Sequence, residues 1–410
     1  MTPAAEAEAI ILGCVVPLKD VETVAVDQAA GRILAADLTS PLDFPHWDNS
    51  AMDGYAVRYA DVENAGTAPV TLEVIEEIPA GQSPNKTLAA GQAARILTGS
   101  MLPKGADTIV IQEVTQRQGT QVTILEAPKP EQFVRSQGSY LKTGNSLMAA
   151  GTLIGAAEIA VLAAAQQAIV PVFRRPRVAI LSTGDELVSV NQPLQPGQIV
   201  DSNQYALKTL VEQAGAVPVL VDRVADDPEA LKGAIAAAVH QADLVISSGG
   251  VSVGDYDYVD EVLASLGGHI LIRSVAVKPG KPLTVAQFQT CLYFGLPGNP
   301  ASAMVGFWRF IAPALRQLAG VQSASARFIP AVAGQDLKAG GQRETYLWGR
   351  LTLTEQGYEF RLATGGHSSG NLINLVGTNA LARVPVGQTC IVAGSPVSVM
   401  VVSLPTADLC

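Results

Sequence analysis

Cysteine is scarce in this chain: there are four in 410 residues, and none forms a Cys-x-x-Cys pair. Cys291 lies within an apolar run, where a free thiol packs as a small hydrophobic side chain. This pattern gives no support to a disulfide framework and is typical of a reducing compartment. The N-terminal segment is acidic and lacks the basic and apolar regions of a signal peptide, so we expect a cytoplasmic protein.

Basic residues are in the minority, because 27 Lys and Arg face 37 Asp and Glu, which leaves a net charge of −10. Nucleic-acid binding needs clustered positive charge, so we expect no nucleic-acid partner. An anionic ligand would have to be held by a local group of donors rather than drawn in by the overall field. Gln166, Gln167 and His240 interrupt the Ala-rich stretches, so we also expect no membrane span.

Several familiar catalytic motifs are missing. The sequence has no GxxxxGK[ST] loop, no GxGxxG opening a helix after a strand and no GxSxG elbow. The four histidines are far apart in the chain, and only His46 and His367 fall in loops that resemble motifs. A zinc centre and a Ser-His-Asp hydrolase therefore have little support.

The segment from 177 to 320 alternates continuous apolar runs with amphipathic helical patterns, with Asp227 and Pro228 at one expected helix start and Gly215 after one expected end. This alternation predicts a doubly wound parallel sheet with helices on both faces. Residues 51–138 and 325–404 show short alternating runs with turn residues, which predict two small β domains, whereas residues 144–172 read as helical.

Ligands of such sheets bind beyond the carboxyl ends of the strands, and three of these ends carry unusual residues. The first is Ser182-Thr183-Gly184-Asp185-Glu186. Hydroxyl groups and a glycine turn suit an anion, although two carboxylates at a helix start can also be plain capping acids.

The second strand end is SGGVSVGDYD, where glycines allow backbone N–H groups to converge on an anion. Asp255 and Asp257 would be out of place beside a bare phosphate, so we infer that a hard cation such as Mg²⁺ bridges them to it. The alternative is a simple glycine-rich turn between strand and helix.

The third strand end, GLPGNPAS, is stiffened by Pro297 and Pro300 and would read as a capped turn if taken alone. Lys278 and Lys281 flank a Pro-Gly turn at the same sheet edge, and this pair is better suited to anion binding than to plain solvation. In the β-rich part, DNSAMDGYA, RILTGS and Glu113 form polar loops that more often make turns than chemistry.

Together these segments resemble, in order and spacing, the molybdopterin molybdenumtransferase family, which includes bacterial MoeA and the E domain of gephyrin. The combination of DNSAMDGYA, STGDEL, SGGVSVGD, KPGKP and GLPGNP is highly specific, and the match covers nearly the whole chain. The resemblance implies four domains: an extended helical domain (1–50 and 139–174), a small β domain (51–138), an α/β molybdopterin-binding domain (175–322) and a C-terminal β-barrel-like domain (323–410).

The family's activity implies that the chain inserts molybdate into adenylated molybdopterin, with Mg²⁺-dependent release of AMP. It also implies an elongated homodimer, with the site between the α/β domain of one subunit and the β domain of the other. By motif position, the catalytic residues would be Asp53, Thr98, Glu186, Asp226 and Asp257, with Glu186 and Asp257 as metal ligands. The substrate-binding residues would be Ser182, Thr183, Gly184, Ser248, Gly249, Gly250, Ser252, Gly254, Lys278, Lys281, Pro297, Gly298, Asn299, Pro300, Arg135, Arg343 and Ser369.

Two positions depart from the family pattern. Tyr140 stands where the family usually has an aspartate, and the stretch from His367 to Asn371 differs from the usual serine-rich one. The main alternative is a molybdopterin adenylyltransferase, which resembles the α/β part alone and which could also be a docking partner. A scaffold without activity is a second alternative, but such a protein would be free to lose Asp53, Glu186 and the lysine pair.

Overall fold

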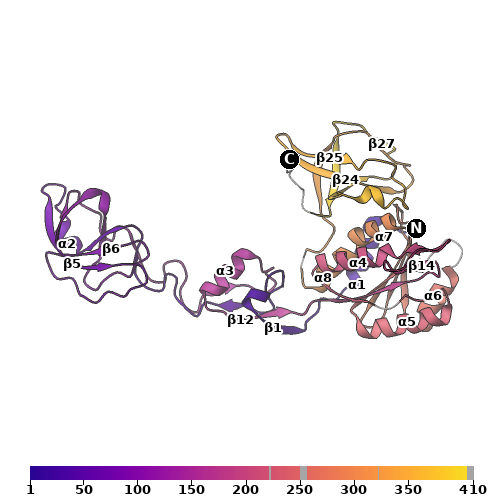
Figure 1. The fold of residues 1–410 in the computed structure, drawn as a ribbon, viewed down its shortest axis with the longest axis horizontal. Helices are drawn as coiled ribbons and strands as arrows, with labels where there is room; N and C mark the ends of the chain where they lie inside the picture. Colours follow the sequence, from indigo (N-terminus) through magenta and orange to yellow (C-terminus); the bar gives the residue numbers. More distant parts are fainter. Residues whose placement is uncertain (221–222, 250–255, 322, 404–410) are drawn as a thin grey trace. The chain divides into compact units, whose positions relative to one another are not determined.

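The computed structural model describes all residues except 221–222, 250–255, 322 and 404–410 (Figure 1). The chain divides into two compact units. Unit 1 comprises residues 1–24, 31–35 and 171–410, and unit 2 comprises residues 25–30 and 36–170. No helix in the described part of the chain is long and apolar enough to cross a membrane.

Unit 1 is built around a six-stranded sheet with the order β16-β13-β17-β21-β20-β18. Its strands are β13 (Arg177–Ser182), β16 (Val217–Leu220), β17 (Leu244–Ser248), β18 (His269–Ser274), β20 (Pro282–Gln287) and β21 (Leu292–Leu296). The four strands from β16 to β21 are parallel, and β20 pairs antiparallel with both of its neighbours. The predicted α/β sheet is confirmed, with one reversed strand that the sequence pattern did not reveal.

Helices cover both faces of this sheet, as the doubly wound prediction requires (Figure 1). One core contains side chains of α1 (Ala4–Cys14), α4 (Ser202–Gln213), α7 (Pro300–Gly306) and α8 (Ala312–Leu318), with a π-helical turn, η3 (Phe307–Ile311), joining the last two. The opposite core contains side chains of α5 (Pro228–Gln241) and α6 (Tyr256–Ser265). Adjacent strand residues enter opposite cores, because side chains alternate along a strand.

The helix boundaries follow the capping residues that the sequence contains. Asp227 caps α5 by accepting a hydrogen bond from the Ala230 amide at 2.9 Å, and Pro228 occupies the first helical position. Gly215, with a φ of +80°, follows the end of α4, where the left-handed conformation favours glycine. Both boundaries were predicted and are confirmed.

The C-terminal part of unit 1 is a closed five-stranded barrel. Its strands are β22 (Phe328–Ala333), β24 (Glu344–Thr354), β25 (Gly357–Leu362), β26 (Ala380–Val384) and β28 (Pro396–Val401), and the pairing of β24 with β26 closes it. Leu351 and Phe360 lie in its core. A short strand of the α/β part, β19 (Val277–Lys278), pairs in parallel with the start of β24 and joins the two parts. The predicted β-barrel-like fold is confirmed.

Unit 2 contains a second six-stranded sheet, with the order β7-β4-β6-β5-β9-β8. Its strands are β4 (Gly54–Val57), β5 (Val70–Ile78), β6 (Gln92–Ile96), β7 (Thr108–Ile111), β8 (Thr115–Gln118) and β9 (Gln121–Ile124), and a short helix, α2 (Tyr59–Val62), follows β4. Gly54 is required by packing, because a Cβ atom there would lie 2.0 Å from the Val110 carbonyl oxygen.

The prediction of a continuous helical pattern over 144–172 is wrong in extent. The helix α3 covers only Ala156–Ala164, and the strands β11 (Ser146–Met148) and β12 (Ile169–Phe173) lie on either side of it. Gln166, with a φ of +57°, ends the helical path, and the following IVPVF sequence is rich in β-branched residues. Strand β12 pairs with β1 (Val21–Ala25).

The remaining elements are short. They are η1 (Val26–Gln28), β2 (Leu38–Thr39), β3 (Asn49–Ser50), η2 (Gln112–Val114), β10 (Val134–Arg135), β14 (Leu187–Val188), β15 (Ile199–Val200), β23 (Leu337–Lys338), η4 (Ile373–Leu375) and β27 (Cys390–Ile391).

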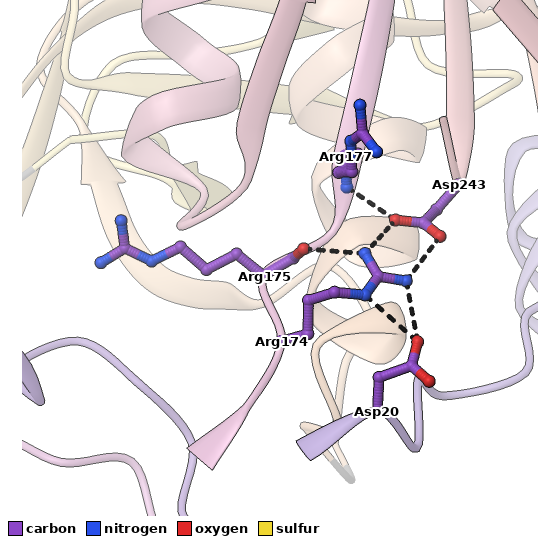
Figure 2. A network of polar contacts seen from close by, with 5 residues as sticks. All are labelled: Asp20, Arg174, Arg175, Arg177 and Asp243. Carbon is purple, nitrogen blue, oxygen red and sulfur yellow. Dashed lines mark hydrogen bonds and ion pairs between the residues drawn. The ribbon is translucent and has the colours of Figure 1, made fainter. Parts of the chain in front are cut away.

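An ion-pair network anchors the start of β13 (Figure 2). The Arg174 guanidinium donates to both carboxylate oxygens of Asp243, at 2.8 and 3.0 Å, and to Asp20 at 3.1 Å. The Arg177 amide donates to Asp243 at 2.7 Å. These hydrogen bonds raise the pKa of Arg174, Asp243 contributing most, so the guanidinium stays charged. The segment before β13 is thereby tied to both β17 and the segment before β1.

Candidate functional site

The carboxyl ends of β13, β17 and β21 meet at one edge of the α/β sheet, with Ser182 beside Ser248 and Ser248 beside Leu296. The chain continues this contact past the strands, since the Thr183 amide donates to the Ser248 carbonyl at 3.0 Å. Ser182 and Thr183 are buried, yet neither hydroxyl oxygen has a hydrogen-bond partner within the described residues. Buried hydroxyls without partners are costly unless a ligand or water satisfies them.

Two glycines shape this edge. A Cβ atom at Gly249, whose φ is +93°, would lie 2.3 Å from the Thr183 carbonyl oxygen. At Gly184, whose φ is +146°, a Cβ atom would lie 2.7 Å from the Glu186 carboxylate. The carboxylate of Glu186 therefore lies directly over the turn that follows β13. The structure thus brings Gly184 of the predicted turn together with the predicted acid Glu186.

Asn203 is a site residue that the sequence reasoning missed. Its buried amide group donates to the Ser248 hydroxyl at 2.7 Å and to the Gly298 carbonyl at 2.8 Å. It lies in the first turn of α4, whose N-cap is Asp201. The amide thus holds two of the three strand-end loops at a fixed separation. The only sequence signal was its position within a segment that resembles the family, two residues after a capping aspartate.

The predicted acids lie in different surroundings. Glu186 is exposed, and Asp226 is exposed with its amide donating to the Asp185 carboxylate at 3.2 Å. Asp257 lies on α6, but its side chain is outside the described part. Gly250, Ser252, Gly254 and Asp255 also lie outside the described residues. Among the described side chains, no three His, Cys, Asp or Glu gather as a metal site.

A group of basic residues forms where β19 meets the barrel. Lys278 and Lys281 are exposed on either side of the Pro-Gly turn. Lys278 is opposite Thr345 in the pairing of β19 with β24. Arg343, directly before β24, donates to the Val277 carbonyl at 3.1 Å. The structure thus brings Arg343 beside the lysine turn, although 65 residues separate Lys278 from Arg343 in sequence.

The GLPGNP turn connects this barrel with the strand ends. Pro297 is buried, and Gly298 lies close enough to Gly249 that an added Cβ would be 3.7 Å from its Cα. On the other side, the Asn299 amide group lies 3.4 Å from the Ser369 hydroxyl, and the Ala301 amide, following Pro300, donates to the Ser369 carbonyl. Ser369 was predicted from a stretch that departs from the family pattern, and the structure places it against the GLPGNP turn.

His367 lies two residues before Ser369, in the same loop of the barrel. Its ring packs against Trp348 with centroids 4.5 Å apart, and neither ring nitrogen has a hydrogen-bond partner within the described chain. Burial lowers the pKa of His367, and the nearby Ala363 backbone offsets this only in part. The imidazole is therefore neutral at pH 7 and adds no charge next to Ser369.

The predicted residues of unit 2 form their own arrangement. The Asp53 carboxylate accepts hydrogen bonds from the Thr98 amide at 2.7 Å and from its hydroxyl at 2.8 Å. These two donors, with a smaller effect of Arg95, lower the pKa of Asp53 and keep it ionised. Arg135 lies on β10, opposite Asn49. Asp53 and Thr98 were predicted as separate polar residues, and the structure joins them.

A cavity of about 680 Å³ lies at the other, amino-terminal edge of the sheet. Arg174, His240, Asp243 and Phe288 are among its lining residues. The last turn of α5 borders it, and the carbonyl groups of a helix C-terminus disfavour anions. Within the described residues, buried hydroxyls without partners lie at the carboxyl edge instead, and the lysine turn follows the carboxyl end of β18, so we assign the candidate site there.

Three family profiles match the chain in order. They are described as the MoeA N-terminal region (domain I and II) over residues 2–165, a probable molybdopterin binding domain over 179–317 and the MoeA C-terminal region (domain IV) over 330–402. A protein of Nostoc sp. named molybdopterin molybdenumtransferase is 57% identical over 392 residues, covering 94% of this chain and 89% of its own length.

Further relatives agree. A molybdopterin molybdenumtransferase of Haemophilus influenzae is 38% identical over 334 residues, covering 81% of each chain. The crystal structure of a molybdopterin biosynthesis MoeA protein from Pyrococcus horikoshii OT3 superposes with a TM-score of 0.83 at 28% identity, covering 98% of this chain and 100% of that one.

Proposed function

The chain belongs to the MoeA family of molybdopterin molybdenumtransferases, and on that premise we propose that it inserts molybdate into adenylated molybdopterin with release of AMP. The observation that carries this proposal is the position of the GLPGNP turn. Its Gly298 carbonyl accepts a hydrogen bond from Asn203, which also donates to the Ser248 hydroxyl, while Asn299 contacts Ser369 of the barrel. One turn therefore separates two places that suit two different anions.

The first place suits the phosphates of the adenylated pterin. Ser182 and Thr183 offer hydroxyls that have no partner among the described residues, and Gly184 and Gly249, both at positive φ, shape the turns beside them. The apolar strands behind these hydroxyls exclude water, which strengthens each hydrogen bond to a charged oxygen. Gly250, Ser252 and Gly254 belong to the same proposed contact by sequence position.

The second place suits molybdate, a tetrahedral dianion. Lys278, Lys281 and Arg343 supply positive charge, and Ser369, against the GLPGNP turn, supplies a hydroxyl. An acidic chain can bind a dianion only where cations converge in this way. Because the nearby His367 ring is neutral, the positive charge of this place comes from Lys278, Lys281 and Arg343.

The proposed reaction has a simple balance. Water cleaves the pyrophosphate bond to give AMP and a phosphorylated pterin, and the two dithiolene sulfurs replace one molybdate oxygen, which leaves as water with the two thiol protons. Glu186 is the residue that would align the water, and Asp226 lies on the neighbouring loop. The basic side chains offset the charge that develops on the departing oxygens.

The residues at this edge fit Mg²⁺, because Glu186 is an exposed oxygen ligand beside a proposed phosphate position and Mg²⁺ is held by one or two carboxylates plus phosphates. Glu186 and Asp257 would hold the ion. When bound, it would neutralise the phosphate charge during cleavage.

We further propose a cytoplasmic homodimer with the four-domain division given by the family pattern, in which Asp53, Thr98 and Arg135 act in the assembled enzyme. The Asp53–Thr98 pair supports this, because a carboxylate held ionised by two donors is a fixed negative group suited to orient a cation or water. A separate adenylyltransferase would supply the adenylated pterin. Adenylyltransferase activity of this chain itself is not favoured, because the profiles match both β-rich parts as well as the α/β part.

The test is AMP release from adenylated molybdopterin and Mg²⁺, measured with and without molybdate. We expect release that depends on molybdate, and we expect Glu186→Gln to bind the adenylated pterin while turnover falls. Glu212→Gln, at an exposed glutamate on α4 away from the strand ends, is the matched control. Transfer of AMP from ATP to molybdopterin, without molybdate-dependent release, would instead show an adenylyltransferase.

A further inference from the structure

A chain of buried polar groups crosses the contact between the α/β part and the barrel. Arg309, on the π-helical turn η3, is 3% exposed and forms an ion pair with Glu8 of α1 at 2.9 Å. Its Nε donates to the Tyr346 hydroxyl at 2.8 Å, and that hydroxyl donates to the Glu344 carboxylate. A buried charge is tolerated only when it is paired and hydrogen-bonded, so each member depends on the next.

The same groups hold the barrel to the α/β part. Glu8 also accepts a hydrogen bond from the Ala326 amide at 2.6 Å, in the segment that leads into the barrel. An additional bond runs from Arg309 to the Ala4 carbonyl at 3.3 Å. Arg309 therefore bonds to both α1 and β24, and β24 is the strand with which the lysine-bearing strand β19 pairs.

Strand alternation separates two kinds of charge here. Glu344 and Tyr346 are two residues apart on β24, so their side chains are on the same face, and both belong to the buried chain. Val277, opposite Glu344, also lies in the core. Lys278 and Thr345 are opposite one another on the other face. A carboxylate thus lies on one face of a strand pair and a substrate-binding cation on the other.

We propose that Tyr346 is a positioning residue for the molybdate site: its hydroxyl keeps the Glu344 carboxylate on the inner face, so that this carboxylate does not compete with molybdate for Lys278 and Arg343. The inference rests on the proposed function for the identity of the anion. Glu344 directly follows Arg343 and directly faces β19, so a small rotation at the start of β24 would bring its negative charge among these cations. With the hydroxyl in place, its hydrogen bond holds the Glu344 carboxylate on the inner face.

The hydroxyl is suited to this role. Tyr346 is fully buried, and burial is the main reason why its pKa is raised above the ordinary value. It remains a neutral donor toward Glu344 and an acceptor toward Arg309 at any working pH. Replacement by phenylalanine removes the hydroxyl and keeps the ring, so the carboxylate loses the hydroxyl donor while the packing around the ring changes little.

The experiment compares Tyr346→Phe, Glu344→Gln and the double variant, with AMP release measured as a function of molybdate concentration. We expect Tyr346→Phe to raise the KM for molybdate roughly tenfold or more, as for loss of one charge-assisted hydrogen bond, with little change in kcat. Glu344→Gln should keep the wild-type KM, and the double variant should regain it, because the competing charge is gone. Tyr358→Phe, on the neighbouring strand β25, is the matched control.

An unchanged KM in Tyr346→Phe would overturn the proposal. A raised KM that the double variant does not restore would also overturn it, because the hydroxyl would then act through packing alone. Molybdate and sulfate binding, measured by titration calorimetry on the same four variants, gives a second readout. If the wild-type protein releases no AMP with molybdate, the proposed function fails, whereas the calorimetric comparison still decides whether Tyr346 controls oxyanion binding.

Discussion

Replacing Asn203 with alanine tests how two of the three strand-end loops are held together. Asn203 is 8% exposed, and its amide makes two hydrogen bonds, to the Ser248 hydroxyl at 2.7 Å and to the Gly298 carbonyl at 2.8 Å. Alanine removes both donors at once. The Gly298 carbonyl and the Ser248 hydroxyl oxygen each lose the hydrogen bond that the Asn203 amide donates.

The magnitude follows from the two bonds. Gly298 is exposed, so water can reach its carbonyl, and each of the two lost hydrogen bonds contributes about 1 kcal/mol, which gives a total of about 2 kcal/mol. For a domain of 150–250 residues, about 1 kcal/mol lowers Tm by about 2–4 °C, which gives a decrease of about 4–8 °C. The effect should appear in the unfolding transition of the α/β part.

Differential scanning calorimetry measures this decrease, and the KM for the adenylated pterin should rise in the same variant, because Gly249 and Gly298 are no longer fixed relative to one another. Gln204→Ala is the control, since the Gln204 side chain has no hydrogen bond among those of the described residues. A Tm within about 1 °C of wild type would refute the reasoning, because it would mean that water replaces the amide at no cost.

Three further predictions concern other positions. Gly54→Ala should destabilise the β sheet of unit 2 by about 3 kcal/mol or more, since its Cβ would lie 2.0 Å from the Val110 carbonyl oxygen, and circular dichroism during urea unfolding measures this. Thr98→Val should raise the pKa of Asp53, because it removes a hydroxyl donor, and carbon-detected NMR titration of the carboxylate would show no shift if the hydroxyl is unimportant. His367 has a pKa lowered by burial, so the unfolded state binds its proton more readily; the stability from the neutral ring is complete above pH about 6.5 and is lost as pH falls toward the folded pKa. His367→Phe should weaken this acid sensitivity in Tm measured from pH 7 to pH 5, and an identical pH dependence would contradict the assignment.

Much of the α/β part was predictable because its signals are local. A capping Asp227 followed by Pro228, glycines after helix ends and apolar runs of strand length each act within a few residues. The turn at Gly184 and the two lysines were also visible, because glycine and clustered charge stand out in an apolar, acidic chain.

The remaining features depend on distant contacts. Strand β20 is reversed, which no property of PLTVAQ shows, since direction is set by the connections between strands. The Ala-rich stretch around α3 suggested a longer helix, because alanine favours helix whatever follows, and strand pairing with β1 overrode that tendency. Asn203 and Arg309 gain their importance only from partners more than 30 residues away.

The pairing of β1 with β12 has a consequence for how the chain is assembled. Unit 2 lies between residues 25 and 170, except for residues 31–35, which belong to unit 1, and strands β1 and β12 pair with one another. The long stretch 36–170 is therefore an insertion in the sequence of unit 1, and the residues on either side of it are joined, because the Ala35 amide donates to the Pro171 carbonyl at 3.0 Å. The Arg174 network adds a second link within unit 1, since Asp20 precedes the insertion and Asp243 follows it. An insertion whose flanking residues are held together can change in length or sequence during evolution without altering the path of the chain on either side of it.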